Sequence, residues 1–152
     1  MGNFYTDVIR VSPHYRTPYR ISDPQLLEPA TRRKVEAILK DAAAHGVMLG
    51  IYETYRSEER QERLFQQGAS QLRHVGVHHY GLACDIVYLV DGEPSWKGDF
   101  GLLGHLARAH GLVWGGDWGH PGRPTGFPDQ DHVQRCAVWQ QADLFRGGWY
   151  PA

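Results

Sequence analysis

The sequence predicts one α+β domain over residues 1–152. Its length fits a single domain that can bury a substantial core. Apolar residues recur at helical spacing between residues 35 and 42 and between residues 103 and 110, whereas residues 47–55 and 82–90 are typical of strands. Because helices and strands alternate along the chain, the order of elements alone would also suit a parallel sheet.

The predicted helices are bounded by residues that start and stop helices. Asp23 with Pro24 starts the first helix and Gly46 closes it. Ser57 is a good N-cap before an acidic first turn, and Gly68 ends that helix. In chain order, the predicted helices cover residues 23–46, 57–67, 100–110 and 137–145.

The predicted strands cover residues 47–55, 82–90 and 132–138. A turn is expected at residues 91–94, and residues 71–76 form a loop. The segment from Gly115 to Gln130 is rich in glycine and proline. It is too long for a simple turn, so we expect a functional loop.

Two short motifs contain the residue types of a zinc hydrolase. His78, Gly81 and Asp85 belong to an H-x-x-G-x-A-x-D run, and Asp129 precedes His132 by three residues. A catalytic zinc takes three ligands from His and carboxylate side chains, and a separate carboxylate acts as base. Residues seven apart cannot face one metal along a straight strand, so the chain must bend at Gly81. Asp85 is the only charge in a buried strand and needs a partner.

The base could be either of two aspartates. Pro128 restricts the backbone ahead of Asp129, which can lean toward a metal bound by His132. Asp131 is the alternative, but as the neighbour of His132 in a strand it should point to the opposite face. We therefore favour Asp129. Similarly, His79 could replace His78 as a ligand, but the spacing to Asp85 favours His78.

Four motifs together resemble one family. In order, they are Tyr55-Arg56-Ser57 with the Glu58 to Gln61 segment, the H-x-x-G-x-A-x-D run, Trp114-Gly-Gly-Asp117-Trp118, and D-x-x-H. They cover residues 50–137 and are similar to those of the zinc D-Ala-D-Ala carboxypeptidases and L-alanyl-D-glutamate peptidases, which act on peptidoglycan and include phage endolysins.

The resemblance implies a role for each motif residue. His78, Asp85 and His132 would bind Zn²⁺, Asp129 would be the general base, and Arg56 would contact the substrate and polarise the scissile carbonyl. It also implies that Gln61, Trp114 and Asp117 line the substrate cleft, although a Trp and Gly loop equally often packs as a turn over the core edge.

The resemblance further implies a small, mostly antiparallel sheet with helices packed against it and the zinc site at the sheet. Residues 1–22 would be an N-terminal arm packed on the peptidase domain, an edge strand or a glycan contact, of which we favour packing. The family usually has Ser two residues before its first metal histidine, where this chain has Gly76. That departure bears on substrate positioning.

Composition restricts the partners and the location. The formal charge is −1, without a basic footprint for nucleic acid. No apolar run could cross a membrane, and no signal peptide is evident, so we expect cytoplasmic synthesis and action on the cell wall after release, as a monomer. Cys84 and Cys136 are expected to be buried thiols.

The expected activity is hydrolysis of a peptidoglycan stem peptide, most simply at the L-alanyl-D-glutamate bond. The alternatives are a D-alanyl-D-alanine carboxypeptidase or dipeptidase, and a non-catalytic, zinc-stabilised protein of the cell wall or virion.

Overall fold

The computed structural model describes residues 2–70, 75–118 and 129–152. Its sheet has the strand order β1-β2-β5-β4, with β3 paired to β2, and every pairing is antiparallel. The α+β class and the antiparallel sheet are therefore confirmed. The strands are β1 Leu49–Glu53, β2 Ala83–Val90, β3 Glu93–Ser95, β4 Val113–Trp114 and β5 His132–Gln134.

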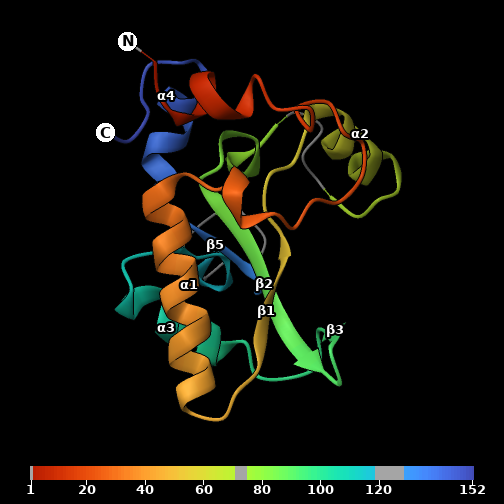
Figure 1. Ribbon diagram of the computed structural model, residues 1–152, viewed down its shortest axis with the longest axis vertical. Coiled ribbons are helices and arrows are strands. Elements are labelled where there is room, and N and C mark those ends of the chain that lie inside the picture. The colour runs from red at the N-terminus through yellow and green to blue at the C-terminus, as the bar shows by residue number, and fades with distance from the viewer. Residues whose placement is uncertain (1, 71–74, 119–128) are drawn as a thin grey trace.

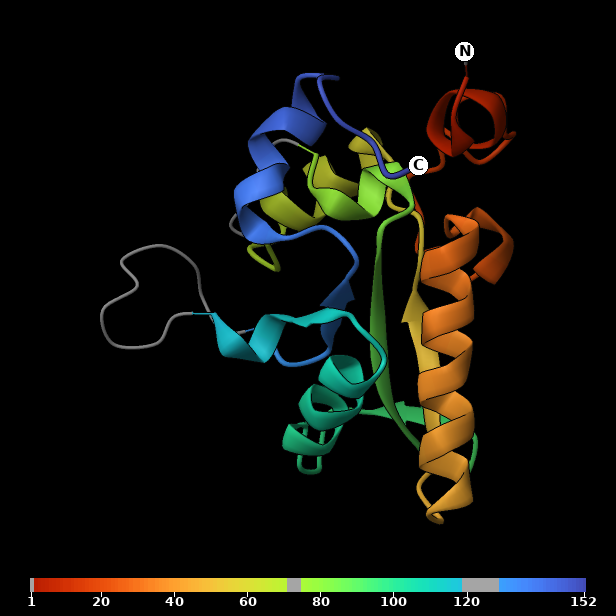
Figure 2. The ribbon, with the colours of Figure 1, turned by 90° about the vertical axis from the view of Figure 1, so that its left-hand side faces the viewer.

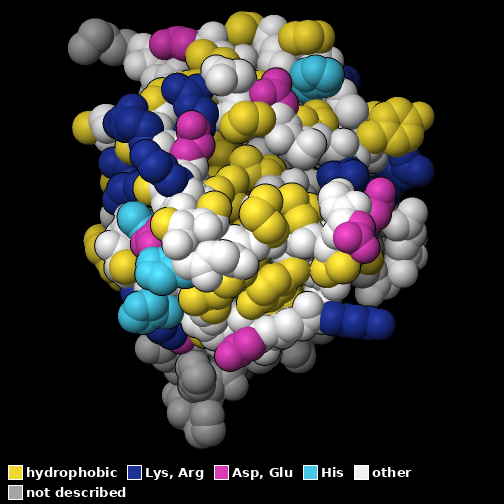
Figure 3. All heavy atoms as spheres, turned by 60° about the horizontal axis from the view of Figure 1, so that its bottom comes forward, with side chains coloured by type: hydrophobic (Ala, Val, Ile, Leu, Met, Phe, Trp, Pro, Cys, Tyr) yellow, Lys and Arg dark blue, Asp and Glu magenta, His cyan; other side chains and the backbone are white. Residues whose placement is uncertain are grey.

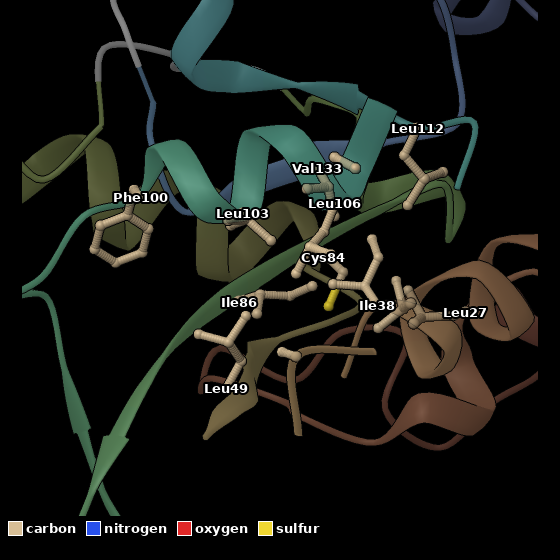
Figure 4. Packing of buried hydrophobic residues seen from close by; sticks show 13 residues of the cluster. Leu27, Ile38, Leu49, Cys84, Ile86, Phe100, Leu103, Leu106, Leu112 and Val133 are labelled. Atoms are coloured by element: carbon tan, nitrogen blue, oxygen red, sulfur yellow. The ribbon is translucent and has the colours of Figure 1, made fainter. Parts of the chain in front are cut away.

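Four α-helices accompany the sheet in the described part of the chain: α1 Pro29–Ala44, α2 Glu58–Gln66, α3 Gly101–Ala109 and α4 Gln141–Phe145. Helix α1 runs alongside β1 and β2 (Figures 1 and 2), and it also contacts α3. Helices α1 and α3 share the main core with β2. Figure 4 shows Ile38, Leu103 and Leu106 meeting Cys84 and Ile86. Since neighbouring strand residues face opposite ways, Asp85 points away from this core.

The first helix begins later than the sequence predicted. Asp23 caps only a short turn, Pro24–Leu26, and accepts a hydrogen bond from the Gln25 amide. Helix α1 begins at Pro29, because a residue before proline disfavours helical backbone and Glu28 is accordingly extended. The Glu28 carboxylate then caps α1.

Glu28 also joins α1 to the end of β5. Its Oε1 accepts hydrogen bonds from the Thr31 amide (3.0 Å) and Arg135 Nη1 (2.8 Å), while Oε2 accepts from the Ala30 amide. Burial alone would raise the pKa of Glu28, but these donors outweigh it and hold the pKa below its ordinary value. The ionised carboxylate is thus the form that stabilises the fold.

Replacing Glu28 with Gln should therefore destabilise the protein in a pH-dependent way. A group with a lowered folded pKa contributes stability above its unfolded pKa, near 4.3, and loses it as the pH falls. We expect a loss of about 1.5–3 kcal/mol at neutral pH, shrinking toward pH 3, in urea unfolding. Glu36→Gln is the matched control, since its 60% exposed carboxylate in α1 should matter little. A pH-independent loss would contradict the assignment.

The second half of the sheet differs from the predicted strands in three places, because β3 and β4 were not predicted and β5 is shorter than predicted. Asp91 and Gly92 form the tight turn with positive φ, but Glu93 and Pro94 belong to β3 rather than to the turn. Strand β5 stops at Gln134 instead of residue 138. The predicted final helix is a turn, Val138–Gln140, that continues into α4.

Residues 2–22 contain a helical turn, Tyr5–Ile9, and no strand, so the edge-strand alternative does not occur. Ile9 and Ile21 form a small core with Tyr55. The Tyr55 hydroxyl donates to the Tyr15 carbonyl (2.6 Å), and the Ser57 hydroxyl donates to the Thr17 carbonyl. The arm thus packs on the segment that carries Arg56.

Figure 3 shows one end of the molecule. Hydrophobic side chains gather in the middle of this face, and charged side chains lie mostly around them. In the described ranges, no helix has both the length and the apolar character needed to cross a bilayer. Both cysteines are buried free thiols, as expected.

Candidate active site

Two segments distant in sequence meet across β2 and β5. His78 lies in a single helical turn, Val77–Tyr80, that precedes β2. Asp85 lies within β2, and its register partner is His132, the first residue of β5. The antiparallel pairing therefore sets Asp85 and His132 side by side, while the turn brings His78 back over them.

Gly81 provides the predicted bend between His78 and Asp85. It ends the helical turn with a φ of +74°, a backbone conformation that residues with a Cβ rarely adopt. A Cβ at this position would also lie 2.7 Å from Ile9 Cδ1 and 3.0 Å from the Leu26 carbonyl oxygen. Both the backbone conformation and the close packing therefore require glycine.

Three atoms that could each bind a metal ion, here called the donor set, converge at this point. His78 Nε2 is 3.1 Å, and His132 Nδ1 is 3.4 Å, from Asp85 Oδ1. All three side chains are buried, and one ligand atom from each lies within 4.8 Å of the others. Burial acts to raise the pKa of Asp85, but His78 and His132 outweigh it and lower that pKa.

The outward nitrogens of both imidazoles have fixed partners. His78 Nδ1 lies 2.7 Å from the Thr54 carbonyl oxygen, which can only accept, so Nδ1 carries the proton. His132 Nε2 lies 2.8 Å from Gln134 Oε1. In its neutral form, each ring therefore turns the nitrogen without a proton toward Asp85. Two such nitrogens and a carboxylate form a donor set that suits zinc.

Arg56 lies beside this donor set and is largely buried. Its Nη2 contacts Glu53 Oε1 (2.8 Å) and Asp85 Oδ2 (3.2 Å), and its Nη1 donates to Gln61 Oε1 (3.3 Å). Burial works to lower the pKa of Arg56, but Asp85 and Glu53 reverse the effect and raise it. The guanidinium is a charged group held in one orientation. Gln61, expected at the substrate, is buried and contacts Arg56.

Asp129 stands at the edge of the donor set. Its Oδ2 is 3.9 Å from His132 Nδ1, and its side chain is 51% exposed. The His132 amide donates to the Asp129 carbonyl (3.2 Å), so a turn brings the two side chains to the same side. The carboxylate thus faces both the buried site and solvent.

The expectation that Asp131 points away from the site is wrong. Carboxylate oxygens of Asp85, Asp129 and Asp131 all lie within 4.8 Å of one another. Strand alternation does not apply to Asp131, because β5 begins one residue later and residues 129–132 form a turn. Burial and the nearby Asp85 and Asp129 raise the pKa of Asp131 to about 8, while Trp96 Nε1 donates to its Oδ2 (3.0 Å).

The two residues of the Trp114-Gly-Gly-Asp117 motif have partners within the protein. Trp114 Nε1 donates to the Gln130 carbonyl (2.7 Å), and Arg108 Nη2 contacts Asp117 Oδ1 (2.9 Å). A Cβ on Gly115 would lie 2.3 Å from the Asp129 carbonyl oxygen. Because it lacks a Cβ, Gly115 lets the turn that contains Asp129 approach the motif closely. The hydrogen bond from Trp114 to Gln130 then holds this turn in place.

His79 and Gly76 are also placed by the structure. His79 is buried against the N-terminal arm, and its Nε2 is 2.9 Å from the Tyr5 hydroxyl, so it lies outside the converging donor set. Gly76 precedes the turn with His78 and makes no side-chain cap. Pro128 and most of the predicted loop 115–130 lie outside the described residues, as do residues 71–74 of the loop 71–76.

Sequence reasoning missed several residues around the site. One is Glu53, which precedes Arg56 by three residues. Another is Gln134, which follows His132 by two residues in β5, so the two side chains lie on the same face of the strand. The alternation signal could have identified Gln134. Nothing local indicated Trp96, which lines a cavity of about 430 Å³ with Phe100, Asp129, Gln130 and Asp131.

Two curated proteins with similar sequences are named as peptidases of the L-alanyl-D-glutamate bond. The peptidoglycan L-alanyl-D-glutamate endopeptidase CwlK of Bacillus subtilis is 27% identical over 130 residues, which span 73% of this chain and 74% of that protein. The L-alanyl-D-glutamate peptidase of Listeria phage A118 is 32% identical over 122 residues, 78% of this chain but 41% of the phage protein. No family model matches the chain.

Solved structures share the fold. The L-Ala D-Glu endopeptidase ChiX of Serratia marcescens matches with a TM-score of 0.60 and 23% identity, over 78% of this chain and 90% of that one. The vancomycin resistance D,D-pentapeptidase VanY, solved in complex with Zn(II), matches with a TM-score of 0.58 and 15% identity, over 79% and 78% of the two chains.

Proposed function

This chain belongs to the family of zinc D-Ala-D-Ala carboxypeptidases and L-alanyl-D-glutamate peptidases, and we propose that it is a zinc peptidase that hydrolyses the L-alanyl-D-glutamate bond of peptidoglycan stem peptides. The observation that carries this proposal is the convergence of His78, Asp85 and His132 beside the part-exposed Asp129. The named bond follows the two curated relatives.

His78 Nε2, His132 Nδ1 and Asp85 Oδ1 would hold the zinc ion. When bound, zinc acts as a Lewis acid that lowers the pKa of water and polarises the carbonyl under attack. The Thr54 carbonyl accepts from His78 Nδ1 and so orients the ring with Nε2 toward the site, so this ligand needs no rearrangement. Asp85 brings one negative charge, and its contact with Arg56 keeps the carboxylate oriented.

Asp129 is the general base in this proposal. Its Oδ2 takes a proton from the attacking water and returns that proton to the leaving amine nitrogen. A carboxylate that is 51% exposed and faces the buried donor set can exchange protons with both the water and the substrate.

Arg56 would bind the substrate carbonyl or a neighbouring carboxylate. Its guanidinium remains charged, and Glu53, Gln61 and Asp85 fix its plane, so little side-chain entropy is lost on binding. We propose further that the protein acts at the cell wall as a monomer and does not bind nucleic acid.

The test is mass spectrometry of purified sacculi incubated with the zinc-loaded protein, beside a chelated control. New L-Ala carboxyl termini that depend on the metal are the expected result. Released D-Ala would instead indicate the carboxypeptidase or dipeptidase alternative. If the folded, zinc-bound protein produced no new termini, the non-catalytic cell-wall or virion protein would replace the peptidase.

A further inference from the structure

Gln134 is an amide buried beneath the candidate metal site. It is fully buried and lies on β5, two residues after His132 and on the same face. Its Oε1 is 2.8 Å from His132 Nε2, the ring nitrogen that points away from Asp85. A buried polar group of this kind needs hydrogen-bond partners for all its strong donors and acceptors.

The partners of Gln134 determine which way its amide points. Its nitrogen lies 2.6 Å from the Cys136 carbonyl oxygen, an atom that can only accept, and 3.0 Å from Gln141 Oε1 in α4. Flipping the amide would place its oxygen against the Cys136 carbonyl oxygen, which is repulsive. The amide oxygen of Gln134 must therefore face His132.

This orientation also determines the proton on His132. An amide oxygen cannot donate a hydrogen bond. His132 Nε2 therefore carries a proton, and its N–H donates a hydrogen bond to Gln134 Oε1. In the neutral ring the lone pair is then on Nδ1, which lies 3.4 Å from Asp85 Oδ1. Gln141 thus helps to fix the orientation of the Gln134 amide, and the Gln134 amide fixes the position of the proton on His132.

We propose that Gln134, anchored by Gln141 and the Cys136 carbonyl, is a positioning residue that holds His132 in the ring orientation and tautomer needed to bind the metal through Nδ1. The proposal rests on the proposed zinc site. A neutral amide suits this position because it accepts a hydrogen bond from the imidazole N–H without adding a second buried negative charge beside Asp85. The C-terminal helix α4 thereby supports a metal ligand on the sheet.

The first test uses the unaltered protein without metal. Two-bond ¹H–¹⁵N correlation spectra of histidine-labelled protein distinguish the protonated from the unprotonated ring nitrogen. We expect the His132 proton on Nε2. A proton on Nδ1 in the neutral ring would overturn the proposal, whether or not the protein binds zinc or cleaves peptidoglycan.

The second test measures zinc dissociation constants by competition with a chromophoric chelator. Gln134→Met keeps the side-chain length but removes the acceptor, and should weaken zinc binding about 10–100-fold. Gln141→Met leaves the Cys136 anchor in place and should weaken binding less. Thr31→Val is the matched control: Thr31 is equally buried, and its hydroxyl donates to Glu28 rather than to a candidate metal ligand.

The outcomes separate positioning from general stability. Unchanged zinc affinity in Gln134→Met would overturn the proposal, as would an equal loss of affinity in Thr31→Val. If Gln134→Met does not fold, unchanged affinity in Gln141→Met would overturn it in the same way. A wild-type protein that binds no zinc would refute the proposed zinc site instead, and the nuclear magnetic resonance result would still decide the tautomer.

Discussion

Asp129→Asn should retain zinc and the native fold but lose turnover about 10²–10⁴-fold, the range that positioned general bases contribute. The amide is nearly isosteric but cannot take a proton from water. Asp129 lies outside the buried donor set of His78, Asp85 and His132, so the metal affinity should change little. Turnover is measured as the rate of new termini from sacculi at saturating zinc, with the zinc content determined in parallel.

Asp131→Asn is the matched control for this experiment. Asp131 belongs to the same group of carboxylates, but Trp96 Nε1 donates a hydrogen bond to its Oδ2, which makes that oxygen a poorer acceptor for a catalytic proton. We expect a distinctly smaller loss than for Asp129→Asn. The reverse ranking, with zinc retained in both variants, would transfer the base role to Asp131.

Glu53→Ala should be among the most destabilising single substitutions, at about 3–5 kcal/mol. The Glu53 side chain is 2% exposed, and its two oxygens bind Arg56 Nη2 (2.8 Å) and Arg60 Nε (3.0 Å). Alanine would leave two largely buried guanidinium groups without their shared counter-charge. The free energy of unfolding in urea measures the loss.

Glu93→Ala provides the comparison for Glu53, because Glu93 is an exposed glutamate at the start of β3. Its removal should change the free energy of unfolding by about 0.5 kcal/mol or less. Similar losses of unfolding free energy in the two variants would show that the Glu53 ion pairs make no net contribution to stability. A partly folded Glu53→Ala protein should also bind substrate less well, because Arg56 loses one of the groups that orient it.

The sequence predicted that His78, Asp85 and His132 would lie together, because its signals are local. The spacing of His78 and Asp85 requires a bend, and Gly81 between them meets both the backbone and the packing requirement at that point. The strand of residues 82–90 was recognisable because its side chains are apolar on both faces, which made the single charge at Asp85 conspicuous.

The base assignment shows where local reasoning ends. Alternation correctly opposes Cys84 and Asp85, which lie inside β2, but it fails for Asp131 one residue outside β5. Strand boundaries depend on which partner is available for pairing, and that partner is distant in the sequence. The start of α1, by contrast, follows a local rule, since Glu28 directly precedes Pro29 and does not adopt helical backbone.

By itself, the sequence determined the residue types of the site, the bend at Gly81 and the approximate order of helices and strands, because these follow from spacing and from backbone preferences over a few residues. Only the tertiary structure decided which nitrogen of each histidine faces Asp85, that Asp131 joins the acidic group, and that Glu53 and Gln134 hold Arg56 and His132. These features depend on hydrogen bonds between segments that meet only when the sheet forms, and no spacing within one segment specifies them.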